Sequence, residues 1–244
     1  MFLTLNILFA FFIQFTSLPT ANLQGHFVKD QGIDHNFPPE IPKPPKGVPA
    51  GHLRPLGYQK PADSKAKSFG PSIPPDVFFD RCISKRKPCS ITDIYHPTAQ
   101  ATWGDKYLAK TFGELNFVVL VKQPTQEWLE VPMKFHTFLK KYHYEDWKLQ
   151  SPIYEELKPH LTIPLPIQCP SVLQNLQFVS LWLSSGPASS PLSYDSNDQL
   201  HCILAGRADF ILISEDQQKT FHMEEVPYKN WGAGRSSLNV DQVN

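Results

Sequence analysis

The sequence predicts an α+β protein in which helices come first and lead into a partial double-stranded β-helix, a roll of two antiparallel layers. Helical spacing of apolar residues dominates before residue 144, whereas short apolar segments separated by turn residues follow residue 176. Separation of helices from an antiparallel sheet is typical of the α+β class, and repeated short strands favour a roll. The 244 residues suffice for one core.

Residues 1–21 have the pattern of a cleaved signal peptide. An apolar core runs from Ile7 to Phe15, and small residues follow it as far as Ala21. This core is shorter than the ~20 apolar residues that a membrane span needs. We therefore expect cleavage near Ala21, no membrane span in the mature chain, and a protein that is secreted or held in the lumen of the endoplasmic reticulum.

Proline marks the next segment as a leader. The chain has 24 prolines, about twice the usual ~5%, and they concentrate between residues 37 and 75. Such sequence favours polyproline II and offers few side chains for packing. We expect a proline-rich leader at 22–73 and the folded domain at 74–244. Lys plus Arg and Asp plus Glu number 23 each, so bulk charge does not attract nucleic acid, which is excluded as an expected partner.

The helical part contains three expected helices and a strand. The first helix should begin at 75–76, where Asp76 favours the first turn, and end near the basic run 84–88. Its expected buried residues are Val77, Phe78 and Ile83. A second helix fits 104–112, with Gly113 closing it in the left-handed conformation. Residues 114–122 are rich in β-branched side chains and predict a strand. A third helix fits 133–144, with an apolar face formed by Phe135, Phe138, Leu139 and Tyr142.

Short strands are expected in the last third of the chain. Residues 176–185 and 200–204 are apolar, and a turn at 205–207 separates them from the apolar run 209–214. This alternation of strand and turn is the basis for the predicted roll.

Cysteine and histidine give no metal-binding pattern. Cys82, Cys89, Cys169 and Cys202 could form two disulfides in any of three pairings, and spacing does not choose among them. Buried free thiols are the alternative, and zinc is disfavoured because neither CxxC nor HxxxH occurs. His136 and His143 are expected to be solvated or at the edge of the core, and His160 to lie in an exposed loop. The fingerprints of other enzyme classes, such as GxSxG, the P-loop and HExxH, do not occur.

Residues 181–210 read LWLSSGPASSPLSYDSNDQLHCILAGRADF. This segment resembles the JmjC domains, the cupin-like (cupin 8) family of iron(II) and 2-oxoglutarate dioxygenases, in which an H-x-D motif precedes G-x-K-x-F. The segments GHLRPLG, FFDRCISKRKPC, WGDKYLAKTFGELN and LPIQCPSVLQNL follow the order found in such proteins. The resemblance implies a JmjC-type cupin fold over most of the mature chain.

The resemblance also assigns the site residues. The His and Asp of H-x-D share one face of a strand and bind iron, a distant His completes the triad, and a Lys holds 2-oxoglutarate. Here Asp195 stands at the Asp position, Ser193 at the His position and Ala208 at the Lys position. Ser190 lies where a residue can contact the co-substrate. His201, six residues beyond Asp195, is the substitute metal ligand that we consider, although the family does not use that position.

The chain reaches Asn244 without the P-G-D-x-L-Y-I-P and W-x-H segments that supply the distant His, so we expect a truncated domain. The resulting expectation is a catalytically inactive protein that binds neither iron(II) nor 2-oxoglutarate and that binds a protein partner or itself. One alternative is an active protein hydroxylase represented by an incomplete chain. Another is a secreted structural or binding module held by disulfides, which predicts that no cysteine is free.

Overall fold

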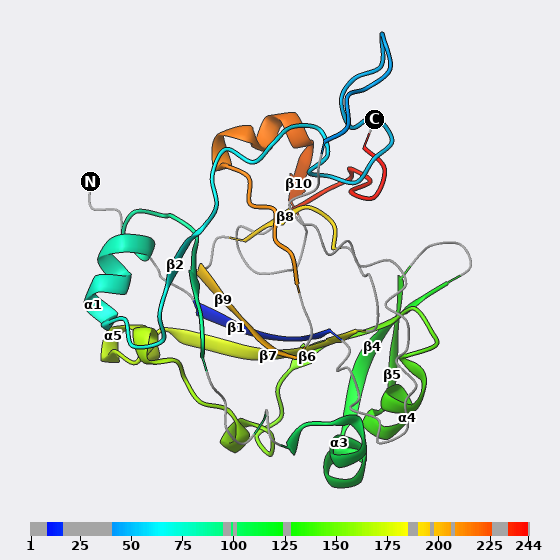
Figure 1. Cartoon of the computed structure of the whole chain (residues 1–244). Coiled ribbons are helices and arrows are strands. Elements are labelled where there is room, and N and C mark those ends of the chain that lie inside the picture. Colours follow the sequence, from blue (N-terminus) through cyan, green and yellow to red (C-terminus); the bar gives the residue numbers. More distant parts are fainter. Residues whose placement is uncertain are drawn as a thin grey trace.

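A six-stranded sheet dominates the protein (Figure 1). The computed structural model describes residues 9–16, 41–94, 99, 102–123, 128–184, 190–195, 198–205, 208–225 and 234–243. The order of the strands in the sheet is β5-β4-β6-β7-β1-β9. Their bounds are Phe9–Thr16 for β1, Asn116–Lys122 for β4, Trp128–Lys134 for β5, Trp147–Pro152 for β6, Leu176–Ser184 for β7 and Asp198–Ala205 for β9.

Two small sheets flank the large one. Strands β8 (Ser193–Tyr194), β11 (Gly234–Ser236) and β10 (Met223–Glu225) form an antiparallel sheet, and β2 (Lys67–Phe69) pairs in parallel with β3 (Cys89–Ile91). In the large sheet, β5, β4, β6 and β7 are antiparallel, whereas β1 runs parallel to both β7 and β9. The predicted α+β class is confirmed.

Short helices complete the fold. The α-helices are α1 (Pro75–Phe78), α3 (Asp105–Phe112), α4 (Phe135–Lys141) and α5 (Pro170–Leu173). A π-helix, η1 (Phe79–Ile83), continues α1, and 3-10 helices lie at η2 (Lys158–His160), η3 (Leu165–Ile167) and η4 (Glu215–Phe221). Within the part of the chain that the structure describes, no helix is both long and apolar enough to span a membrane.

The first predicted helix is confirmed over α1 and η1, but one of its expected core residues is wrong. Phe78 is buried and Ile83 packs against the smaller core cluster, as predicted, whereas Val77 is 37% exposed. The buried face is set by Phe78 and Cys82, which are four residues apart. Val77 is one residue away from that face and therefore points to solvent.

Helix α3 ends differently from the prediction. Gly113 has a φ of −59°, which is right-handed, so the expected left-handed closure is wrong. Glycine is needed at position 113 because the neighbouring atoms leave no room for a Cβ. A Cβ at this position would lie 2.1 Å from the carbonyl oxygen of Ala109 and 3.0 Å from Cβ of His136.

The third predicted helix is shorter than expected because Met133 and Lys134 belong to strand β5. This strand, which the sequence did not predict, pairs with β4 along its full length, from Asn116 opposite Lys134 to Lys122 opposite Trp128. The predicted strand at 114–122 is confirmed as β4, and the predicted apolar face of α4 is confirmed. All four of its residues are buried, namely Phe135, Phe138, Leu139 and Tyr142.

The strands predicted at 176–185 and 200–204 are confirmed as β7 and β9, but the strand predicted at 209–214 is wrong. Residues 208–214 form no regular element, and Leu212 is 64% exposed. An apolar run becomes a strand only where a neighbouring strand bonds its backbone. Of the predicted turn at 205–207, Gly206 and Arg207 lie outside the described residues.

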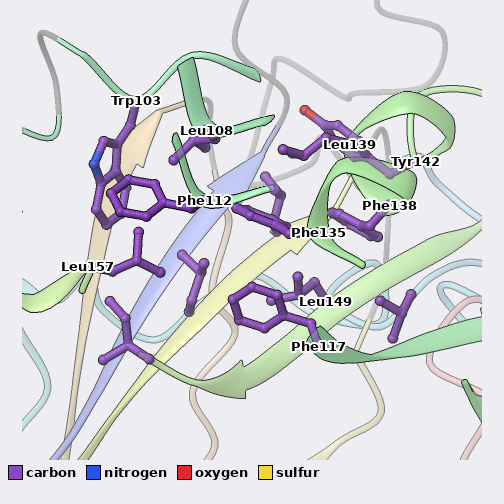
Figure 2. Close-up of a cluster of buried hydrophobic side chains, with 14 of the residues drawn as sticks. Trp103, Leu108, Phe112, Phe117, Phe135, Phe138, Leu139, Tyr142, Leu149 and Leu157 are labelled. Carbon is purple, nitrogen blue, oxygen red and sulfur yellow. The ribbon is translucent and has the colours of Figure 1, made fainter. Parts of the chain in front are cut away.

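The main core lies between one face of the sheet and helices α3 and α4 (Figure 2). Aromatic side chains fill it, and Phe117 and Phe135 approach to 4.8 Å between ring centroids. A smaller cluster gathers around α1, η1 and α5, with Ile73, Phe78, Cys82, Ile167 and Val172 buried in it.

Part of the predicted leader packs against the folded domain. Phe69 contacts the smaller cluster, in which Ile73 is 8% exposed. The backbone N–H of Leu53 donates to the carbonyl of Val243 at 2.7 Å, and the N–H of Val243 donates to Arg54 at 3.0 Å. The segment before residue 74 therefore joins the C-terminal segment.

Cys82 and Cys89 form a disulfide with a Cα–Cα distance of 6.0 Å. Cys169 and Cys202 are free and half-buried. One of the pairs that the sequence left open is thus formed, and the two remaining cysteines do not form the second disulfide.

We expect Gly113→Ala to destabilise the protein by about 1–3 kcal/mol, because the added methyl group would overlap the Ala109 carbonyl. Urea unfolding of the purified protein measures this. Gly70→Ala is the matched control, since a Cβ at Gly70 has no neighbour within 4 Å. Equal stability of the two variants would contradict the close approach at Gly113.

Candidate functional site

Two of the predicted site residues meet through a third that the sequence analysis did not single out. Gln199 Nε2 donates a hydrogen bond of 3.1 Å to the Asp195 carboxylate, and Gln199 Oε1 lies 3.2 Å from Nε2 of His201. Gln199 and His201 are two residues apart on β9, so both belong to the same face of the strand. Asp195, Gln199 and His201 therefore form a hydrogen-bonded row, which we call the β9 row.

The imidazole of His201 is enclosed by two aromatic rings. Its centroid lies 6.0 Å from the Trp182 ring, edge to face, and 5.1 Å from the Phe210 ring. Burial lowers the pKa of His201 to about 4, because a charged imidazolium loses its hydration in this setting. His201 is therefore neutral at pH 7.

The β9 row fixes the position of the histidine proton. The Gln199 amide nitrogen donates to Asp195, so the Gln199 oxygen faces His201 and accepts a hydrogen bond. Nε2 of His201 carries the proton in that bond. A protonated ring nitrogen has no lone pair to offer a metal, so this atom does not act as a ligand while the row is intact.

The other predicted site residues are not members of the β9 row. Ser193 is exposed on β8, where its register partner is Arg235 of β11, and Ser190 is exposed as well. Ala208, at the position where the JmjC domains that the motif resembles have Lys, is half-buried and contributes neither charge nor a hydrogen-bonding side chain. Among residues whose placement is described, no three His, Cys, Asp or Glu side chains gather as a metal site would require.

Asp198, at the start of β9, interacts electrostatically with Arg86 of the basic run 84–88. Burial raises the pKa of the Asp198 carboxyl group, and the positive charge of Arg86 partly offsets this effect. Arg86 also lies 3.8 Å from Glu215 of η4, with both side chains mostly exposed. Exposed pairs of this kind contribute little to stability, which agrees with the solvated character expected for residues 84–88.

A cluster that the sequence analysis missed joins α3 to α4. The Tyr142 hydroxyl donates to both carboxylate oxygens of Asp105, at 3.1 and 3.2 Å, and Nε2 of His143 lies 2.5 Å from the same carboxylate. Burial, and then the charge of Asp105, raises the pKa of Tyr142 above its usual range. Since the three side chains join the ends of two packed helices, they have a structural role. His143 is exposed beside the buried Tyr142, in agreement with the expectation that it is solvated or at the edge of the core.

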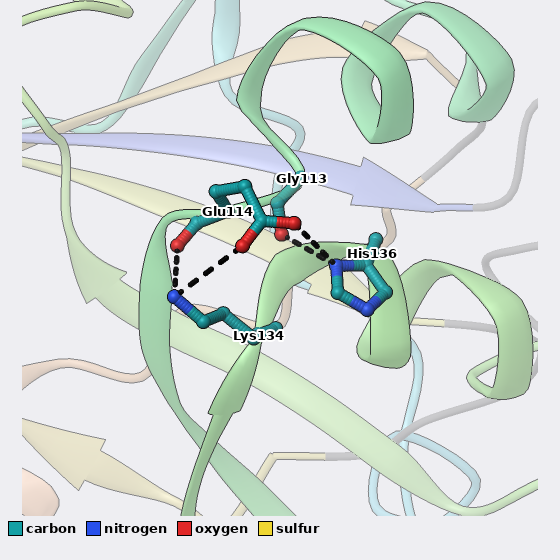
Figure 3. Close-up of polar contacts among 4 residues, drawn as sticks. All are labelled: Gly113, Glu114, Lys134 and His136. Atoms are coloured by element: carbon teal, nitrogen blue, oxygen red, sulfur yellow. Dashed lines mark hydrogen bonds and ion pairs between the residues drawn. The ribbon is translucent and has the colours of Figure 1, made fainter.

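His136 has a structural role at the neighbouring corner (Figure 3). Its Nδ1 donates to the Gly113 carbonyl at 2.9 Å and lies 3.5 Å from the Glu114 carboxylate. The Lys134 ammonium donates to the Glu114 carbonyl at 2.8 Å. These bonds hold the turn after α3 against the start of α4.

The expectation that His160 is solvated in an exposed loop is wrong. His160 ends the 3-10 turn η2 and is half-buried, with its ring 5.5 Å from Phe112 and 5.9 Å from Trp103. The turn directs the ring onto aromatic side chains of the main core, which a linear sequence pattern does not show.

Neither a protein-family model nor a curated protein matches this chain.

Because burial depresses the pKa of His201 to about 4 from 6.5, the unfolded chain binds a proton between these pH values and the folded chain does not. The free energy of unfolding is therefore not reduced by His201 above pH 6.5. It falls as the pH decreases toward 4, by up to about 3 kcal/mol, because the unfolded chain then binds the proton more tightly. Urea unfolding at a series of pH values, compared with His201→Gln, measures the difference. Parallel stability profiles for the two proteins would show that His201 does not titrate in this way.

Proposed function

We propose that this chain is a JmjC-type, cupin-like protein that has lost oxygenase chemistry and that binds a protein partner in the secretory pathway. The thirty-residue resemblance from Leu181 to Phe210 supports the family, and the substitutions within it support the loss of chemistry. The observation that carries the proposal is the β9 row, in which Asp195 and His201 are engaged with Gln199.

The residues present do not fit an iron(II) centre. His201 uses Nε2 as a donor, and its other ring nitrogen, Nδ1, is buried. The serine hydroxyl at position 193 is a weak neutral ligand compared with an imidazole. Nor do they fit 2-oxoglutarate, because Ala208 has no charge with which to hold its distal carboxylate. No reaction step is therefore derived through either group.

Two features support the proposed setting and partner. The Cys82–Cys89 disulfide is compatible with an oxidising compartment, as export would provide. Phe210, Ile211 and Leu212 are 46%, 38% and 64% exposed and follow one another directly after the site. Contiguous exposed apolar side chains favour contact with a protein surface, either a partner or a second copy.

The state of the cysteines disfavours the alternative of a module held entirely by disulfides. That alternative requires all four cysteines to be paired, whereas Cys169 and Cys202 are free.

Iron(II) titration with 2-oxoglutarate present tests the proposal. We expect no charge-transfer absorption and no co-substrate turnover from the full chain, because the residues at positions 193 and 208 cannot perform their family roles. Turnover by the unmodified chain would instead support the active hydroxylase.

A matched pair of variants tests the assignment of the motif. Ser193→His should raise iron(II) affinity at least about tenfold in calorimetry, because it restores the imidazole beside Asp195. Ser190→His, at an exposed serine that does not belong to the H-x-D pair, is the control. If the two variants bind iron(II) equally, Asp195 is not the remnant of an H-x-D pair.

A further inference from the structure

Strand β1 occupies an unusual place for a segment near the start of a chain. It lies between β7 and β9 and is parallel to both (Figure 1). Its residues pair with 176–184 on one side and with 198–205 on the other. Both edges of the strand are therefore used, and it is an interior strand of the sheet.

The outer strand depends on β1. In the sheet as described, β9 is the last strand and β1 is its neighbour, whereas β7 also pairs with β6. Removal of β1 would leave β7 with one ladder and β9 with none. A strand without a ladder leaves its backbone N–H and C=O groups unpaired, which a folded sheet does not tolerate in its interior.

Without β1, a groove would remain between β7 and β9, and it would accept only a particular kind of segment. It needs about eight extended residues, no proline and no charge, because each N–H is bonded on one side or the other and interior parallel strands are nearly continuous apolar runs. The sequence FAFFIQFT of β1 meets these conditions. The same residues include most of the apolar core of the predicted signal peptide.

We propose that the groove between β7 and β9 is a strand-acceptor site whose occupant is this chain's own segment Phe9–Thr16. The segment predicted to direct export is then also the strand that completes the sheet. Cleavage near Ala21 would sever β1 from the chain, so the severed strand either stays bound as a peptide or leaves and releases β9. This inference rests on the proposed export of the chain and not on the proposed loss of oxygenase chemistry.

Cys202 provides a reporter within β9. Ile13 pairs with Leu181 on one side and with Cys202 on the other. Burial raises the pKa of the Cys202 thiol to about 12, so at mildly alkaline pH it stays protonated and reacts slowly. Release of β9 would return the thiol to water, where its pKa is ~8.5. Cys169, the other free thiol, serves as an internal reference.

The first test is a cross-link in the full chain, synthesised without membranes so that no cleavage occurs. Paired residues on neighbouring strands lie about 5 Å apart, within the range that a disulfide bridges. Ile13→Cys should therefore form an intramolecular disulfide with Cys202, detected by mass spectrometry of peptides. Gln14→Cys, whose β9 partner is Ile203, should not. Absence of the bond, or a bond between two molecules, would overturn the proposed occupant, the latter in favour of a second copy.

The second test opens the groove. Ile13→Pro removes a ladder bond and should increase the labelling rate of Cys202 at least about tenfold, while the amide of Leu149 in β6 keeps its exchange protection. An excess of the peptide FAFFIQFT with terminal lysines should restore the slow rate. Unchanged labelling, or no effect of the peptide on the faster rate, would refute the acceptor site. If the Leu149 amide also loses protection, the whole chain has unfolded. The disulfide between Ile13→Cys and Cys202 then decides whether Phe9–Thr16 occupies the site.

Discussion

The structure depends on strand β7. Its backbone bonds β6 on one side and β1 on the other, so it joins the antiparallel part of the sheet to the parallel part. Leu181 and Leu183, on one face of the strand, are 1% and 4% exposed in the main core. Because the helices α3 and α4 cover that core, β7 connects the helical half of the chain to the strand that carries His201.

This arrangement gives the β9 row a structural setting within the large sheet. His201 lies on β9, and its ring contacts Trp182 of β7 across the intervening strand. The imidazole is buried enough to remain neutral and is oriented by the Gln199 side chain. A neutral donor histidine between aromatic rings is well suited to fixing β9 against its surroundings. Its Nε2 proton occupies one of the two nitrogens that could bind a metal, and no three His, Cys, Asp or Glu side chains gather as a metal site among the described residues.

Sequence reasoning succeeded where periodicity reflects burial within one element. The buried face of α4, with Phe138 and Leu139, follows from spacing alone, and β4 and β7 follow from their branched and apolar residues. Sequence reasoning failed where hydrogen bonding to a neighbouring strand decides whether a segment forms a strand. Residues 209–214 have strand-like composition but form no strand, whereas β5, with Glu130 and Pro132, is a strand because β4 bonds it.

The same limits apply to the site. His201 was identified as a candidate from its even spacing, and the two-residue spacing of Gln199 could have extended that argument to the β9 row. Asp105 and Tyr142 could not have been connected, because 37 residues separate them and only the packing of α3 on α4 brings them together. Strand β1 was also missed, since an apolar run of this length satisfies both a signal peptide and an interior strand.

The position of β1 has a consequence for the order of events during synthesis. Its two neighbours begin about 160 and 180 residues after it ends. At translation rates of roughly 5–20 residues per second, the segment waits about ten to thirty seconds before β7 and then β9 emerge. Throughout that interval it is an unpaired apolar peptide on the growing chain. Any factor that binds apolar nascent segments therefore has access to β1 before the strands that pair with it have been synthesised.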